Sequence, residues 1–147
     1  MSDYFENFKD ALPDIKKVKQ LKKQLEKKGV KYIYSNWIDF LGSPKTKPMP
    51  LSDFEDLCMG KGPQFAVHSV SFVPELTPAD NDQIPLPDLD SLLICPWDKT
   101  CAWVFADLYW NDKPYDVCPR MTLKKQIKES AKSCLLYTSD AADDRIG

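Results

Sequence analysis

The fold is decided by residues 77–107, TPADNDQIPLPDLDSLLICPWDKTCAWVFAD. The first part of this stretch, up to Pro87, is rich in proline and aspartate, which predicts a rigid surface connection. Two short apolar runs follow at residues 91–95 and 101–106, separated by a Pro-Trp-Asp-Lys turn at residues 96–99. Apolar runs of this length bounded by turn residues are typical of strands, so we predict a strand pair on which the rest of the chain packs.

A helix and a hairpin are predicted near the start of the chain. In residues 13–28, apolar side chains recur at three- and four-residue steps and Gly29 supplies a stop, which predicts an amphipathic helix. The lysines on its other faces are either an anion-binding face or, by default, simply the solvated face. The aromatic and β-branched residues 30–40 predict a strand. Residues 45–49 predict its hairpin partner, which Pro48 and Pro50 place at a sheet edge.

A short helix, an inner strand and a C-terminal helix complete the pattern. Ser52 is the predicted N-cap of a helix over residues 52–59, with a glutamate three positions later as in a capping box. Residues 65–72 are apolar on both faces of a strand, so we expect them inside the sheet. Residues 107–116 predict a hairpin, and apolar residues at every fourth position predict a helix over residues 119–133.

Composition and the predicted elements together indicate one small globular domain. The chain has 147 residues, of which 43% are hydrophobic, enough for a packed core. The fold class that follows is α+β: a twisted, mixed sheet of about five strands with an N-terminal helix, one short helix and a C-terminal helix.

Charge, hydropathy and cysteine usage exclude several classes of protein. The net charge of −2 predicts no nucleic-acid partner. No stretch approaches the roughly 20 apolar residues that span a bilayer, so no membrane partner is expected. The N-terminus lacks the apolar region of a secretory signal, and the five cysteines contain no CxxC pair. We therefore expect a cytoplasmic protein with reduced thiols.

Few residues suggest chemistry by themselves. His68 is the only histidine, and a thiolate–imidazolium pair with Cys58 or Cys118 is the one His-based site available to it. The default for His68 is an exposed or hydrogen-bonded histidine without a catalytic role. Four carboxylates in the proline-rich connection provide a possible cation site, although a plain surface loop is the default; they are Glu75, Asp80, Asp82 and Asp88.

The order of short motifs adds a family resemblance. The series PAD…PDLDSLL…PW…W…ADL…KPYDVCPR…LKKQI resembles the N-terminal β-grasp domain of glutamine synthetases, in the branch of type III glutamate–ammonia ligases and glutamate–methylamine ligases. The resemblance covers about residues 21–133. It implies a helical lead-in at residues 1–28 and a β-grasp domain at residues 29–133, cut off before the large catalytic domain of the family.

The last residues do not continue the helical pattern before them. CLLYTSDAADD, at residues 134–144, resembles the conceptual translation of a sequencing adapter, and a disordered acidic tail is the alternative. We therefore expect residues 134–147 to be a non-native tail on a truncated sequence.

The resemblance also implies an amine-binding loop. Phe65-Ala66-Val67-His68 stands where many members have Phe-Asp-Gly-Ser, whose aspartate helps to bind and deprotonate ammonium. Ala66 takes the place of that aspartate here. Asp80 matches the aspartate of a Glu-Ser-Asp element, which makes it the better candidate for an acidic group near the amine. Other matches are framework positions, namely Asp88, Trp97, Asp107 and Arg120, and Cys118 replaces an aspartate before Pro119.

The activity that the resemblance implies is ATP-dependent amide formation from glutamate and ammonium, or methylamine in its place. The γ-carboxylate of glutamate is phosphorylated, and the deprotonated amine attacks the acyl phosphate while two Mg²⁺ or Mn²⁺ ions neutralise phosphate charge. ATP and metal would bind the catalytic domain of the full-length enzyme, in a homo-oligomer whose sites lie between subunits. The 147-residue chain alone is then expected to be inactive.

A second hypothesis comes from a different class of protein. Free-standing β-grasp modules bind partners and perform no chemistry, and the fold alone does not choose between the two roles. The adapter-like tail favours the ligase domain.

Overall fold

The structure is a computed structural model that describes residues 3–67 and 76–132. Its strands are β1 (Tyr32–Ile38), β2 (Pro44–Pro50), β3 (Ile84–Pro87), β4 (Leu93–Ile94), β5 (Cys101–Trp110) and β6 (Lys113–Pro114). Its helices are α1 (Phe8–Ala11), α2 (Ile15–Lys27), α3 (Phe54–Cys58) and α5 (Pro119–Lys132), with 3-10 turns η1 (Leu51–Asp53) and η2 (Leu89–Ser91).

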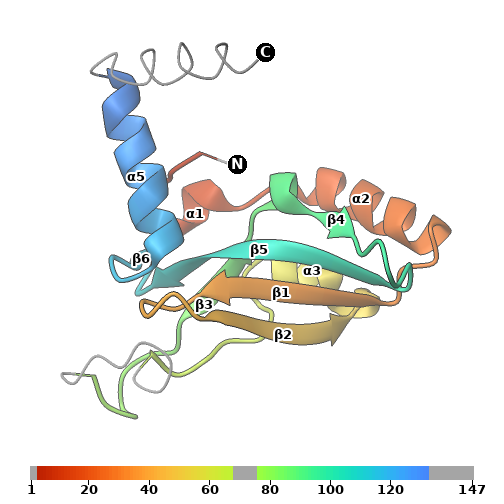
Figure 1. Cartoon of the computed structure of the whole chain (residues 1–147), viewed down its shortest axis with the longest axis horizontal. Coiled ribbons are helices and arrows are strands. Elements are labelled where there is room, and N and C mark those ends of the chain that lie inside the picture. Colours follow the sequence, from red (N-terminus) through yellow and green to blue (C-terminus); the bar gives the residue numbers. More distant parts are fainter. Residues whose placement is uncertain (1–2, 68–75, 133–147) are drawn as a thin grey trace, which may run out of the picture.

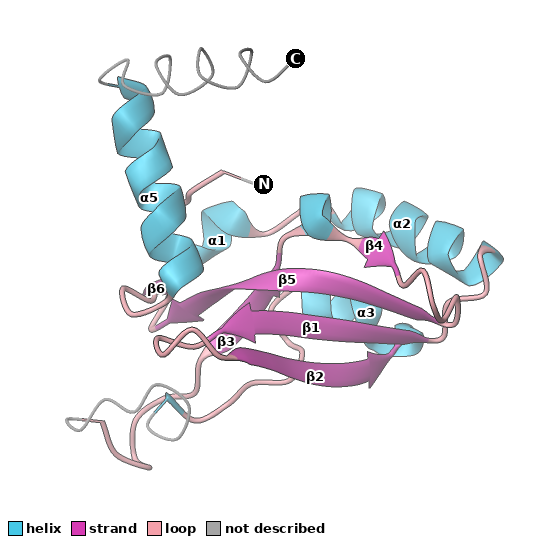
Figure 2. Cartoon of the chain, in the orientation of Figure 1, coloured by secondary structure: helices cyan, strands magenta, loops and turns pink. Residues whose placement is uncertain are grey.

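The strands form one mixed sheet built around β5. The order is β2-β1-β5-β3, and the short strands β4 and β6 also pair with β5. β1 runs parallel to β5, whereas the other pairs are antiparallel. Helices α2 and α3 cover one face of the sheet, and α5 stands at the end where β5 finishes (Figures 1 and 2). The α+β fold with a mixed sheet is thus confirmed.

Two apolar clusters form the core. The first lies between the sheet and its covering helices, where Ile33 and Val104 from neighbouring strands meet Val18 of α2 and Phe54 of α3. The second lies at the opposite end of the sheet and includes Tyr109. Residues of β1 are buried and partly exposed in turn, as expected of a strand that turns one face toward the core.

Local signals fix several element ends as the sequence predicts. The Asp14 side chain accepts from Lys16 N at 2.8 Å and so caps α2, which ends before Gly29 at φ +82°. The β5–β6 turn places Asn111 and Asp112 at φ values of 50° and 61°, the left-handed pair that a two-residue hairpin turn requires. β2 lies at the sheet edge, as its prolines indicate.

Three predictions about elements are wrong. Phe65 forms only an isolated bridge with Gln83 and no inner strand begins there; the remainder of that prediction, from residue 68, lies outside the described residues. Ser52 does not cap the short helix, because it lies within η1 and its hydroxyl bonds to Asp53 at 2.7 Å. The end of the proline-rich connection is strand β3, because prolines are tolerated in a strand that has only one neighbour.

None of the helices in the described residues is long and apolar enough to cross a membrane.

Candidate active-site loops

The first predicted loop packs against the second core cluster. Phe65 is buried and stacks on Trp37, with ring centroids 4.3 Å apart and planes within 6°. Val67 is fully buried, and Ala66 between them is partly exposed. The aromatic stack holds this loop close to the end of β1, whereas His68 lies outside the described residues.

The second predicted loop is joined to the first through the backbone. Phe65 N donates to Gln83 O at 3.3 Å, and Gln83 N donates to Phe65 O at 2.9 Å. Asp80 lies three residues before Gln83, on the segment that leads into β3. Its carboxylate accepts from Thr77 N at 2.7 Å and from Thr77 Oγ1 at 3.1 Å, which stabilises its own turn. The structure therefore brings the two loops together and points the Asp80 carboxylate at Thr77.

A buried ion cluster lies where α5 meets the sheet. Arg120 Nε bonds to Asp107 Oδ1 at 2.8 Å, and its Nη2 pairs with Asp88. Lys124 Nζ lies 3.3 Å from Asp88 Oδ2 and also pairs with Asp107. The Asp88 side chain is fully buried and that of Lys124 is 2% exposed. Two carboxylates face two cations, so the cluster is balanced in charge and ties α5 to β5 and to the end of β3.

The cluster explains the role of the framework residues. Asp88, Asp107 and Arg120 were recognised in the sequence as matched positions without a role. Lys124 was missed, although it lies four residues after Arg120 and therefore on the same face of the helix. Among the residues that the structure describes, no three metal-ligating side chains come together. Glu75, one of the four carboxylates of the possible cation site, lies outside the described residues.

The cysteines proposed as partners of His68 are buried. Burial raises the pKa of the Cys58 thiol to about 12, and nearby Glu55 adds to the effect. Burial is also the main cause that raises the pKa of Cys118. Both side chains are therefore neutral thiols near pH 7, which argues against a thiolate at either position.

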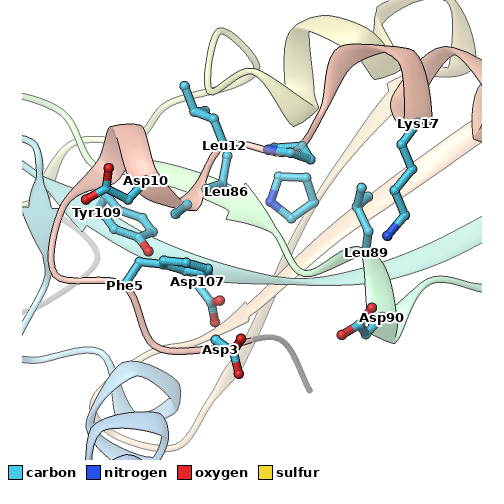
Figure 3. Close-up of a pocket in the computed structure, with 13 residues that line it drawn as sticks. Asp3, Phe5, Asp10, Leu12, Lys17, Leu86, Leu89, Asp90, Asp107 and Tyr109 are labelled. Carbon is cyan, nitrogen blue, oxygen red and sulfur yellow. The ribbon is translucent and has the colours of Figure 1, made fainter.

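A cavity of about 310 Å³ lies between the N-terminal segment and the sheet (Figure 3). Asp3, Asp10 and Asp90 surround it together with Lys17, and Asp107 reaches it from β5. None of the four described loop residues predicted for the amine site lines this cavity. It is therefore separate from the candidate loops.

No protein-family model matches the chain. Comparison with individual proteins finds relatives among the glutamine synthetases and a glutamate–methylamine ligase. The glutamine synthetase of Rhizobium meliloti (strain 1021) is 38% identical over 108 residues, which are 74% of this chain and 24% of the relative. The glutamate–methylamine ligase of Methyloversatilis universalis is 30% identical over 117 residues, 78% of this chain and 26% of the relative. A solved structure of GmaS with ADP superposes with a TM-score of 0.69 at 28% identity, over 77% of this chain and 26% of that one.

Fold and sequence together relate this chain to one part of proteins named glutamine synthetase and glutamate–methylamine ligase. Over the matched residues, the chain belongs to the glutamine synthetase family. It spans about a quarter of the length of the curated relatives that it matches.

Proposed function

We propose that this chain is the N-terminal domain of a glutamine synthetase-type ligase, which forms a γ-glutamyl amide from glutamate and ammonia with ATP hydrolysis. One observation carries the proposal: the backbone bridge between Phe65 and Gln83 joins the two loops that the family resemblance assigns to the amine site. The chain that contains these loops is 38% identical to a glutamine synthetase over 108 residues.

The proposed role of these loops follows from the chemistry of the amine. Ammonium must be attracted as a cation and must then lose a proton before it can attack an acyl phosphate. Asp80 is the acidic group available beside the loop of Phe65, and its carboxylate is only partly buried. We assign ATP and divalent metal to the part of the full-length enzyme that this chain does not span, because the relatives extend well beyond the matched residues.

Methylamine is the second candidate substrate. Ala66 stands at the position of the usual aspartate, and its neighbours Phe65 and Val67 are apolar, so an alkyl group would be accommodated there. The names of the relatives also differ in the amine. They include a glutamate–methylamine ligase and a γ-glutamylanilide synthase of Acinetobacter sp that is 31% identical over 55 residues. We also propose that the full-length enzyme is a homo-oligomer in which this domain borders the site of a neighbouring subunit.

A domain exchange tests the proposal. Residues 21–132 of this chain replace the matched quarter of the Rhizobium meliloti glutamine synthetase, and ATP-dependent amide formation is measured with ammonium and with methylamine. We expect a folded, active chimera, and the ratio of the two rates identifies the amine. The Asp80→Asn chimera should lose activity, whereas Asp82→Asn, a neighbouring exposed carboxylate, should not.

The exchange also separates the ligase domain from a free-standing binding module. A chimera that has the subunit assembly and circular dichroism spectrum of the parent enzyme but forms no amide would contradict the proposal. That result would favour the binding module instead.

A further inference from the structure

Two cysteines face each other across the β4–β5 turn, on the face of the sheet opposite the covering helices. The antiparallel register pairs Leu93 with Trp103 and Ile94 with Ala102, so that the next pair is Cys95 with Cys101. Cys95 N donates to Cys101 O at 3.0 Å, which continues the pairing to these residues. Paired residues in antiparallel strands point to the same face, with Cα atoms about 5.5 Å apart when hydrogen-bonded. That separation lies within the range of a disulfide.

The side chains of both cysteines line one pocket. Ile94 and Ala102 belong to the core beneath the helices, so alternation directs the two cysteines to the opposite face. There they share a pocket of about 310 Å³ with Tyr34, Trp97 and Trp103. Both thiols are free in the structure, and their side chains are buried at the base of this pocket.

Cys101 and Asp98 both influence the ionisation of Cys95. Burial raises the pKa of Cys95, and Cys101 and Asp98 add to the effect. Cys101 is also the largest influence that raises the pKa of Tyr34. The Cys101 thiol donates to Asp98 Oδ2 at 3.3 Å.

We propose that Cys95 and Cys101 form a redox-active pair, which a two-electron oxidant such as a peroxide converts to an intramolecular disulfide across the β4–β5 turn. One sulfur attacks the peroxide, whose O–O bond breaks, and becomes a sulfenic acid as the first water leaves. The second sulfur then attacks that sulfur and displaces a second water. Two thiols and one hydrogen peroxide thus yield one disulfide and two waters, and a thiol reductant reverses the change.

The disulfide is compatible with the turn that it closes. Asp98 Oδ1 accepts from Thr100 N at 2.9 Å and from Thr100 Oγ1 at 2.7 Å, and neither bond involves sulfur. Oxidation removes the thiol hydrogen that Cys101 donates to Asp98, and the sulfur also lies 3.7 Å from Thr100 Oγ1. The other described cysteines have no such partner across a strand pair, because Cys58 belongs to the first core cluster and Cys118 to the second.

Peptide mapping tests the pair. The full chain carrying Cys134→Ser, which removes the thiol of the tail, is treated separately with hydrogen peroxide and with diamide. It is then denatured, alkylated with iodoacetamide and digested with trypsin. Trypsin cuts after Lys99, between the two cysteines, so a disulfide leaves two peptides joined. We expect the joined species, two hydrogens lighter than the separate thiol peptides, and its loss after dithiothreitol. Fragment spectra assign the second sulfur to Cys101 and distinguish it from Cys118.

Two variants complete the test. Cys95→Ser should abolish the joined peptides, whereas Cys58→Ser, a buried cysteine with no partner of this kind, should leave them unchanged. Full alkylation of both Cys95 and Cys101 after either oxidant, or a disulfide from Cys95 to any other cysteine, overturns the proposal.

Discussion

Lys124 is a cation with almost no contact with solvent, held by the Asp88 and Asp107 carboxylates. Lys124→Met removes one of two cations from a balanced buried cluster and leaves two carboxylates to share Arg120. Breaking a buried ion pair in this way costs about 3–5 kcal/mol, so we expect a clear loss in the free energy of unfolding, measured with urea. Lys125→Met, at the exposed neighbouring position, is the control and should change it little. Equal stability of the two variants would mean that the cluster is not formed.

Burial of the Cys58 thiol makes the free energy of unfolding depend on pH in the alkaline range. Its pKa of about 12 in the folded chain lies above the ordinary value of 9.0, so its contribution to stability is complete below pH 9 and is lost as pH rises toward 12. Between pH 8 and pH 10 the free energy of unfolding should fall by about 1 kcal/mol from this group. Cys58→Ala should reduce the slope measured by urea denaturation over that interval. An unchanged slope would show that Cys58 ionises equally in both states.

The N-terminal segment packs on the second core cluster, and Phe8 is one of its contacting side chains. Phe8 packs edge-to-face on Tyr109 at 5.5 Å and lies against Gly60. A Cβ atom at Gly60 would be 2.2 Å from Phe8 Cζ, which is closer than any real contact. Gly60 also has φ +71°, and Gly42 has φ +81° with nothing within 4 Å of its missing Cβ. The two glycines therefore share the backbone strain and differ in the steric clash.

Gly60→Ala should consequently displace the N-terminal segment, whereas Gly42→Ala should bear only the backbone cost of about 1–2 kcal/mol. Limited proteolysis within residues 3–12, followed by mass spectrometry, measures the displacement. The double variant Phe8→Ala, Gly60→Ala should show no further increase over Phe8→Ala alone, because the clashing ring is gone. Equal cleavage of the two alanine variants would refute this packing.

At the scale of the whole molecule, the chain corresponds to only a part of each relative. Among its described residues no three metal-ligating side chains come together, and the relatives are about three times as long as the chain. The purified 147-residue chain should therefore form no γ-glutamyl amide from glutamate, ATP and either amine in the presence of Mg²⁺ or Mn²⁺. A coupled assay for ADP with mass spectrometry of the product checks this, with the full-length Rhizobium meliloti enzyme as positive control. Amide formation by the chain alone would refute the prediction.

The sequence by itself determined those features whose causes lie within a few residues. The period of α2 and its Asp14 cap, the edge position of β2 and the Asn111-Asp112 turn all follow from side-chain spacing or backbone preference. The family was also evident from the order of motifs, which the relatives confirm. The role of Phe65 and Asp80 in an amine site stays a prediction.

Only the tertiary structure decided the features that depend on a distant partner. Residues Ile84–Pro87 look like a loop because of their prolines, and they form a strand because β5 offers an edge. Lys124 looks like one more surface lysine until α5 sets it against Asp88 and Asp107, 36 and 17 residues earlier. The pairing of Cys95 with Cys101 likewise depends on the register of β4 on β5. Strand pairing and buried charge are energies between segments far apart in the chain, and local sequence patterns do not contain them.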